Sequence, residues 1–464
     1  MFSYLEAARF LRVTPEFEDP SLKIRSFSID TRTLAPGDLF VAFKGENNDG
    51  HAFVAAAFGK GASGALVDLR RREHVLSKLR DGKIQAKNLI PVPDPQAAMT
   101  ALAAAYRKTL PVRTIGITGS VGKTTTKEFL FYLLKQKYSA LATTGNLNNH
   151  LGVPIMLSRL EPSHQYAVME MGASHQGEIR ALAGLALPSG GILTPIGPAH
   201  LEGFGSLENV YKAKLELADA FGKDDPLVVP ADDEYLLEKI RQKSRQAITV
   251  GFSDRADYRL ADLESGNGEV SFAIAGSRRF SFPGQAAFLA LNAGLAIAMA
   301  KSIGFTWEEI PSRWADVGFA SGRFRETILA NGVRVIDDSY NANPVSFENA
   351  LKALRSLTVA GKKIVVFADM LELGAGEKDF HRELGERIAV SGADMAFAYG
   401  PLARISVDAI CGLEARHFTD AEETLAALKE ALRPGDLVLF KGSRGMHVEK
   451  VLEGIRNITF SSQK

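Results

Sequence analysis

IGITGSVGKTTT, residues 115–126, is the stretch that decides the fold of this chain. Its apolar start, Ile115–Thr118, is typical of a short buried strand, and a helix-forming run follows. Gly119 and Gly122 let the backbone between them turn so that its amide groups face an anion. We therefore predict a phosphate-binding loop between a strand and a helix, as in ATP-binding α/β domains.

The residues after the second glycine supply the remaining contacts of such a loop. Lys123 would place a cation by the β- and γ-phosphates, and Thr124 would offer a hydroxyl to a magnesium ion. The spacing is G-x-x-G-K-T-T, because Ile117 stands where the stricter form of the motif has its first glycine. A chance Gly-Lys-Thr in an ordinary glycine turn is the alternative. The predicted ATP contacts are Gly119, Ser120, Gly122, Lys123, Thr124 and Thr125.

The composition is that of a large globular enzyme. The 464 residues predict two to four domains, and 46% hydrophobic with 23% charged residues can fill several cores. A formal net charge of +1 gives no basic surface for nucleic acid or an anionic membrane. The single cysteine, Cys411, excludes an internal disulfide and fits a reducing compartment.

Targeting and membrane signals are weak in this sequence. The N-terminal MFSYLEAARFL lacks the basic start and long apolar run of a signal peptide. The most apolar stretch, Ala286–Ala300, is too short to cross a bilayer and carries Asn292 near its middle, so we predict a buried helix. We expect a cytoplasmic protein with no membrane insertion and no nucleic-acid partner.

Three blocks separate along the chain, and we predict domains at 1–94, 95–318 and 319–464. The first block mixes short strands and helices and ends at PVPDP, residues 91–95, where three prolines predict a linker. A helix over 96–108 opens the second block. The predicted fold is α/β in three domains: a small mixed α/β N-terminal domain, a central P-loop ATPase-type domain with a mostly parallel sheet, and a C-terminal Rossmann-like domain.

Short apolar runs separated by helical segments predict the strands of the two larger sheets. In the second block they are AVMEMG (167–172), GGILTPIG (190–197), PLVVP (226–230) and QAITVGF (246–252). In the third they are VRVIDDSY (333–340), KIVVFADM (363–370), ADMAFAYG (393–400) and DLVLFKGS (436–443).

Polar residues of the second block follow the phosphate loop. In TTGNLNNHLGVP, residues 143–154, Asn148 and Asn149 could bind a substrate or cap turns. Glu170 ends a predicted strand, where ligands of open α/β sheets collect, so it suits a magnesium ion or is simply solvated. His200 and Lys214 belong to a further motif, residues 198–214, but a lone histidine and a helical lysine predict no chemistry by themselves.

The third block gathers polar residues where its strands end. The motifs are SGRF (321–324), IDDSYNANP (336–344), ADMLELG (368–374) and KGSRGMH (441–447). Such positions suit ribose or substrate contacts and also plain helix capping. Lys441 and Arg444 could bind phosphate or carboxylate. We predict that these motifs share one cleft.

Taken together, these motifs resemble those of the Mur ligases, the ATP-dependent amide-forming enzymes of peptidoglycan precursor synthesis. The resemblance covers nearly the whole chain and begins with DTRTLAPGDLFVAFKGENNDGHAF, residues 30–53. It continues in GSVGKTTTKE, TGNLNNHLGVP, MEMGASHQGEI, HLEGFGSLENVYKAK, DDSYNANP, DMLELG and KGSRGM.

The resemblance implies a catalytic set with two magnesium ions. Lys123 and Thr124 would bind the phosphates and the first ion, with Glu170 as a further ligand. Lys214 stands fourteen residues after His200, at the position that the family carbamylates, and its carbamate would bind the second ion with His200. Carbamylation requires a neutral amine and therefore a depressed lysine pKa.

The resemblance also implies the substrate contacts. Arg323 would reach the γ-phosphate, and Asn292 and Asp338 the nucleoside. UDP-N-acetylmuramoyl-tripeptide would bind the first block at its UDP end, through residues that include the loop 45–51, and D-alanyl-D-alanine would be the incoming amine. The implied substrate-binding residues are Thr31, Arg32, Lys44, Asp49, His51, Asn148, Asn149, Asn341, Asn343, Lys441 and Arg444.

The implied activity is ATP-dependent peptide-bond formation through an acyl phosphate, which would serve cell-wall biogenesis, cell shape and cell division. We expect a monomer. Phe288 and Leu289 replace a His-Asn pair of the family, so adenine contacts should differ. A folylpolyglutamate synthase-like ligase is disfavoured by DTRTLAPGDLFVAFKG, residues 30–45. A noncatalytic nucleotide switch is disfavoured by the four residues of the implied metal and phosphate sites: Lys123, Glu170, His200 and Lys214.

Overall fold

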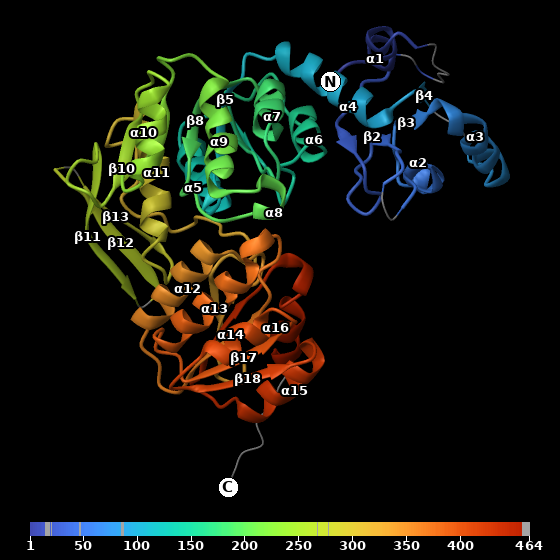
Figure 1. Ribbon diagram of the computed structural model, residues 1–464. Coiled ribbons are helices and arrows are strands. Elements are labelled where there is room, and N and C mark those ends of the chain that lie inside the picture. Colours follow the sequence, from blue (N-terminus) through green and yellow to red (C-terminus); the bar gives the residue numbers. More distant parts are fainter. Residues whose placement is uncertain are drawn as a thin grey trace. The chain divides into compact units, whose positions relative to one another are not determined.

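The computed structural model describes residues 1–13, 19, 21–45, 48–84, 88–266, 268–276 and 278–456. Three sheets form, with four, nine and six strands (Figure 1). The chain divides into two compact units, each assembled from separate segments. Unit 1 comprises Met1–Gly116, Tyr138–Gly172 and Ile179–Gly190, and unit 2 comprises Ile117–Lys137, Ala173–Glu178 and Gly191–Lys464.

The four-stranded sheet is small and parallel, in the order β1-β2-β3-β4. Its strands are β1 (Phe27–Ser28), β2 (Leu39–Val41), β3 (Gly64–Asp68) and β4 (Asn88–Val92). Its helices are α1 (Tyr4–Leu11), α2 (Val54–Gly59), α3 (Arg72–Asp81) and α4 (Pro95–Lys108). Phe40, Val54, Phe58 and Leu79 are among the side chains that fill the core beneath them.

The predicted linker at residues 91–95 is wrong. β4 contains Pro91, paired with Val67 of β3, and α4 begins at Pro95 with Asp94 as its N-cap. β4 is an edge strand, where a residue without an N–H is tolerated, and proline suits the first position of a helix. The segment is therefore regular secondary structure, and α4 belongs to unit 1 with the first block.

The nine-stranded sheet runs β13-β12-β11-β10-β9-β8-β5-β7-β6. All strands predicted for the second block are confirmed, whereas the antiparallel strands β11 to β13 were not predicted. The strands are β5 (Arg113–Thr118), β6 (Ala140–Ala142), β7 (Tyr166–Glu170), β8 (Pro188–Leu193), β9 (Leu227–Pro230), β10 (Ile248–Gly251), β11 (Tyr258–Gly266), β12 (Glu269–Ile274) and β13 (Arg279–Pro283). The helices are α5 (Lys123–Lys135), α6 (Gly152–Ser158), α7 (Glu178–Ala186), α8 (Leu201–Phe204), α9 (Leu207–Leu215), α10 (Glu234–Gln242) and α11 (Leu289–Ser302).

The apolar stretch around Asn292 forms α11, so the predicted buried helix is confirmed. Most of its residues are buried on all sides, Asn292 included, and it packs on α5. Within the described residues, no helix combines the length and the apolar character that crossing a bilayer requires.

The six-stranded sheet runs β14-β15-β19-β16-β17-β18 and is parallel except for β14. Its strands are β14 (Arg325–Ile328), β15 (Arg334–Asp338), β16 (Lys363–Ala368), β17 (Met395–Tyr399), β18 (Glu414–Phe418) and β19 (Leu437–Lys441). Its helices are α12 (Pro344–Ser356), α13 (Glu377–Ala389), α14 (Ala403–Ala409), α15 (Ala421–Ala431) and α16 (Glu449–Ile455) (Figure 1). Because β15, β19 and β16 are parallel neighbours, the polar segments after them gather at one edge of the sheet.

Arg107, near the end of α4, is a buried cation that binds backbone carbonyls. Its guanidinium donates to the carbonyls of Ala186, Leu110 and Val112 at 2.8, 3.1 and 2.7 Å. Burial lowers its pKa. These bonds satisfy acceptors that the chain leaves inside unit 1.

We expect Arg107→Ala to lower the free energy of unfolding by about 3 kcal/mol, because it leaves buried carbonyls without donors. The measurement is the urea midpoint followed by far-ultraviolet circular dichroism. Lys108→Ala, at the exposed neighbouring position, is the control and should change the stability by less than about 0.5 kcal/mol. Equal urea midpoints for the two variants would contradict the stabilising role assigned to Arg107.

Candidate functional site

The predicted phosphate loop lies between β5 and α5. Gly119 and Gly122 both have positive φ, +150° and +83°, and Gly122 is the N-cap of α5. A Cβ on Gly119 would lie 2.1 Å from Oγ1 of Thr194, and one on Gly122 would lie 2.4 Å from Oδ1 of Asn292. Both the conformation and the close packing therefore require glycine at these two positions.

The loop is tied to the segment that follows β8. The backbone amides of Ser120 and Val121 both donate to the carbonyl of Pro195, at 3.0 and 3.2 Å. The Ser120 hydroxyl donates to the carbonyl of Gly197 at 2.8 Å. The expectation that the amides between the two glycines face an anion is therefore wrong for Ser120 and Val121, whose amides are bonded to Pro195. The N-terminus of α5 is the feature of this loop that would attract an anion.

Lys123 lies folded over its own loop. Its Nζ donates to the carbonyls of Gly119 and Ser120, at 2.9 and 3.2 Å. The adjacent Thr124 is largely buried at the first turn of α5. A glycine cradle, a helix N-terminus and a lysine at one place fit the phosphates of a nucleotide.

Asn292, predicted to contact the nucleoside, lies behind this loop. Its Oδ1 accepts from the Thr126 hydroxyl at 3.3 Å and lies against Gly122. The ring of Phe288, just before α11, contacts Phe324 edge-on at 5.4 Å between centroids. The nucleoside contact stays a prediction, while the packing of Asn292 against the loop is clear from the structure.

Glu170, in unit 1, is held in one orientation at the end of β7. Its Oε1 accepts from Nδ2 of Asn148 at 2.8 Å, and its backbone amide donates to the Thr143 hydroxyl at 3.0 Å. Its Oε2 is buried and has no hydrogen-bond partner among the described residues. An orphaned buried carboxylate oxygen fits a cation ligand, and thus the predicted magnesium site.

Asn149 has a different local role from Asn148. Its Oδ1 accepts from the amides of Leu151 and Gly152, at 3.1 and 2.9 Å, at the start of α6. This is the capping alternative that the sequence left open, whereas Asn148 points to Glu170.

His200 has a left-handed backbone, with φ +52°, and its Nδ1 forms a short hydrogen bond with Oε2 of Glu372. Burial lowers the His200 pKa, and the Glu372 carboxylate opposes this shift. The backbone carbonyl of Glu372 also accepts from the amide of Glu202 at 3.1 Å. The sequence singled out the motif that contains Glu372 but not this partnership, because the two residues lie far apart in the chain.

Lys214, on α9, is 2% exposed, unlike most helical lysines. Its Nζ donates to the carbonyl of Ala173 at 3.3 Å and lies 5.3 Å from the ring centroid of Phe204. Burial, reinforced by the positive charge of Lys123, lowers the pKa of Lys214 to about 7. A substantial fraction of this amine is therefore neutral and nucleophilic near neutral pH.

The predicted metal ligands Thr124, Glu170, His200 and Lys214 stay a prediction, because they include one carboxylate and one histidine. In the part of the chain that the structure describes, no three acidic, histidine or cysteine side chains are clustered to hold a metal ion. Thr124, His200 and Lys214 belong to unit 2, and Glu170 belongs to unit 1. The predicted set differs from such a cluster because it includes a hydroxyl and a modified lysine.

In the C-terminal sheet, Lys441 is buried beside Asp338. Its Nζ lies 2.5 Å from Oδ2 of Asp338 and 3.1 Å from the carbonyl of Asn341, which accepts from it. The guanidinium of Arg323 lies over the Tyr340 ring, with Cζ 4.0 Å from the centroid. Lys441 is therefore committed to an internal ion pair, while its predicted contact with a substrate carboxylate stays a prediction.

The other predicted contacts of this edge have local partners. Asn343 is the N-cap of α12, and its Oδ1 accepts from the Ser346 amide at 2.8 Å. Oδ1 of Asn341 accepts from the next backbone amide at 2.9 Å. Arg444 is exposed and pairs with Glu449 at 3.3 Å. Of this group, Arg444 has the exposed side chain, whereas Asn341 and Asn343 are half-buried.

In the first block, His51 is a buried structural tie. Its Nδ1 lies 2.6 Å from Oδ1 of Asp49, and its Nε2 accepts from the amide of Asp68 at 3.0 Å. Lys44 and Asp49 are joined by an isolated antiparallel bridge. Residues 46–47 of the predicted loop lie outside the described residues.

Thr31 and Arg32 lie in an exposed turn of the same block. Arg32 pairs with Asp30 at 2.7 Å, and the carbonyl of Thr31 accepts from Nζ of Lys60 at 2.8 Å. Their predicted contact with the UDP group stays a prediction.

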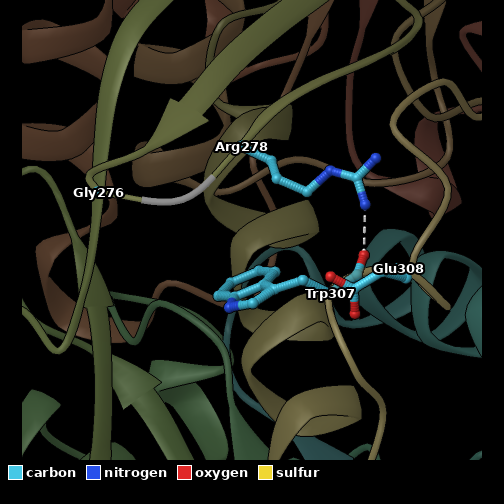
Figure 2. A pocket seen from close by; sticks show the side chains of 4 residues that line it. All are labelled: Gly276, Arg278, Trp307 and Glu308. Atoms are coloured by element: carbon cyan, nitrogen blue, oxygen red, sulfur yellow. Dashed lines mark hydrogen bonds between the residues drawn. The ribbon is translucent and has the colours of Figure 1, made fainter.

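A separate hollow of about 500 Å³ is lined by Gly276, Arg278, Trp307 and Glu308 (Figure 2). Arg278 donates to the backbone carbonyl of Trp307 at 2.5 Å. None of the predicted site residues lines this hollow.

Three domain families match the chain. They are the Mur ligase family catalytic domain over residues 23–107, the Mur ligase middle domain over 117–300, and the Mur ligase glutamate ligase domain over 322–444.

Relatives match over nearly the full length. The chain is 35% identical over 446 residues to the UDP-N-acetylmuramoyl-tripeptide–D-alanyl-D-alanine ligase of Bacillus subtilis (strain 168), covering 95% of this chain and 94% of that protein. The crystal structure of MurF from Acinetobacter baumannii is similar with a TM-score of 0.83 at 29% identity, covering 98% and 99%. The MurF ligase of Thermotoga maritima, solved in complex with ADP, gives a TM-score of 0.77 at 29% identity, covering 93% and 97%.

These similarities confirm the predicted three-domain α/β architecture and the resemblance on which the site residues were assigned. The phosphate loop, the buried lysine and the three matching domains have one common explanation: the chain belongs to the Mur ligase family.

Proposed function

We propose that this chain joins D-alanyl-D-alanine to UDP-N-acetylmuramoyl-tripeptide, with conversion of ATP to ADP and phosphate. The structural observation that supports the proposal is the burial of the Lys214 amine on α9, because burial and the charge of Lys123 lower its pKa to about 7, as carbamylation of this lysine requires. The relatives that carry this activity in their names match along almost the entire chain. ATP use is supported by the T. maritima relative, which was solved with ADP.

The proposed reaction has two steps. The terminal carboxylate of the precursor attacks the γ-phosphorus in line, ADP leaves, and an acyl phosphate forms. The dipeptide amine then attacks the acyl carbon, the C–O bond to phosphate breaks, and the amine loses a proton. Lys123 exchanges its loop carbonyls for phosphate oxygens and stabilises the charge that develops there.

Two magnesium ions would supply further charge neutralisation on the transferring phosphoryl group when bound. Thr124 and the orphaned oxygen of Glu170 are the residues proposed to hold the first ion. The neutral Lys214 amine attacks carbon dioxide and releases one proton, which leaves a carbamate anion. This carbamate and Nε2 of His200 would hold the second ion, while Glu372 holds the other ring nitrogen.

A synthase of the folylpolyglutamate type has less support, because the first block carries the motif DTRTLAPGDLFVAFKG and matches the Mur ligase catalytic domain. A noncatalytic nucleotide switch would not require the buried, neutralised amine of Lys214. A cytoplasmic monomer with domain bounds at 1–94, 95–318 and 319–464 completes the proposal.

We expect Lys123→Ala to lower kcat by at least about a hundredfold, because the phosphate loop loses its cation. Precursor affinity should stay within about twofold, since the first block belongs to unit 1 and Lys123 to unit 2. Phosphate release measures the first quantity, and calorimetric titration the second. Lys135→Ala, an exposed position on the same helix, is the control. An equal loss of precursor affinity would contradict the domain assignment.

Lys214 should carry a carbamate. At fixed dissolved carbon dioxide, its occupancy should rise as the pH increases through about 7, because only the neutral amine reacts. Carbon-13 NMR of the protein equilibrated with labelled bicarbonate detects the adduct. Lys214→Ala should lose activity and regain part of it with acetate, whereas Lys212→Ala, an exposed lysine on α9, should stay active. Normal activity of the Lys214 variant would refute the second-metal site.

D-Alanyl-D-alanine should support phosphate release at least about tenfold better than D-alanine or L-amino acids, a difference of roughly 1.4 kcal/mol. A single amino acid also has a carboxylate, but this group lies one residue closer to the reactive amine, so it cannot pair with a cation placed for the dipeptide carboxylate. The assay is phosphate release with UDP-muramoyl tripeptide. Arg444→Ala and Asn341→Ala should raise the KM for the dipeptide more than that for ATP, with exposed Lys450→Ala as control. Equal rates with single amino acids would assign the chain to another member of the family.

A further inference from the structure

Arg323, the proposed γ-phosphate contact, lies in a short backbone segment that is fixed on both sides. Gly322 and Phe324 both have left-handed backbones, with φ +72° and +53°. The amide of Tyr340 donates to the carbonyl of Gly322 at 3.2 Å, and the amide of Phe324 donates to Oδ1 of Asp338 at 3.1 Å. A left-handed non-glycine residue is strained, so these bonds select a defined path for the backbone around Arg323.

The second of these anchors is itself held by the sheet. Asp338 of β15 and Lys441 of β19 are register partners, and their side chains form the ion pair at 2.5 Å. The Lys441 side chain is 1% exposed, so water does not compete for this pair. The segment that carries Arg323 is thus attached to the ends of two central strands.

The backbone alone does not orient the guanidinium, because an arginine side chain has many rotamers. Among the described residues, no carboxylate forms an ion pair with Arg323. Its guanidinium instead lies over the Tyr340 ring at 4.0 Å. A Cβ on Gly322 would lie 3.0 Å from Cβ and 3.1 Å from the backbone nitrogen of Tyr340, so this glycine permits the close approach of the Tyr340 backbone to the segment.

We propose that Tyr340 is a positioning residue for phosphoryl transfer: its ring orients the guanidinium of Arg323 toward the transferring group. This inference rests on the proposed function, in which Arg323 contacts the γ-phosphate. Stacking on an aromatic face attracts a cation without neutralising it, so the arginine keeps its full charge for the phosphate. A group oriented before the reaction stabilises the transition state without reorganising during it.

The test compares aromatic and aliphatic side chains at residue 340. Tyr340→Leu should lower kcat about tenfold, while the KM values for ATP and the tripeptide stay within about twofold. Tyr340→Phe should stay within about twofold of the wild type in all three, because the ring is retained and the hydroxyl has no hydrogen-bond partner among the described residues. In an Arg323→Ala background, Tyr340→Leu should cause no further loss.

An equal loss from Tyr340→Leu in both backgrounds, or a Phe variant as impaired as the Leu variant, would overturn the inference. Thermal unfolding of each variant checks the fold, and Tyr340→Met replaces Tyr340→Leu if the latter does not fold. The proposed function is tested separately by the wild-type enzyme: without dipeptide-dependent phosphate release, the function itself fails. With that release present, the Tyr340 series decides only the positioning role.

Discussion

Close packing around two glycines is the constraint on which the site depends. Gly119 abuts Thr194 and Gly122 abuts Asn292, so the phosphate loop can take one path between β5 and α5. That path fixes the N-terminus of α5 and the position of Lys123. The fixed charge of Lys123 then contributes to the low pKa of Lys214. Packing at the loop therefore controls chemistry on a different helix.

Two buried lysines show how surroundings decide the use of the same side chain. Lys441 has a carboxylate at 2.5 Å, and the pair fixes the ends of two strands. Lys214 has a carbonyl and an aromatic ring as its described contacts, so burial favours the neutral amine. The first lysine is suited to holding a structure in place, and the second to forming a covalent bond with carbon dioxide.

The sequence predicted most parallel strands of the two larger sheets, and the phosphate loop, because each is a local pattern of apolar runs bounded by glycine or proline. It did not predict the parallel strands β6 and β18, which lie at the edges of their sheets. It missed β11 to β13, whose alternating polar residues, as in YRLADLESG, resemble an exposed loop. It misread the prolines at 91–95, since edge position depends on the whole sheet. The partnership of His200 with Glu372 depends on tertiary geometry, so residue type alone could not predict it. The capping role of Asn343 is local, since its Oδ1 accepts from the Ser346 amide, and the sequence left capping as the alternative to a substrate contact.

The two edge strands of the small N-terminal sheet also affect self-association of the protein. One edge strand, β1, has two residues, and the other edge strand, β4, contains Pro91. A short strand offers few backbone hydrogen bonds to a neighbouring strand, and a proline has no backbone N–H to donate. Neither edge strand is therefore a good template for a strand from another copy of the protein. The residue that resembled a linker in the sequence thus helps this sheet to avoid edge-to-edge aggregation while the chain folds.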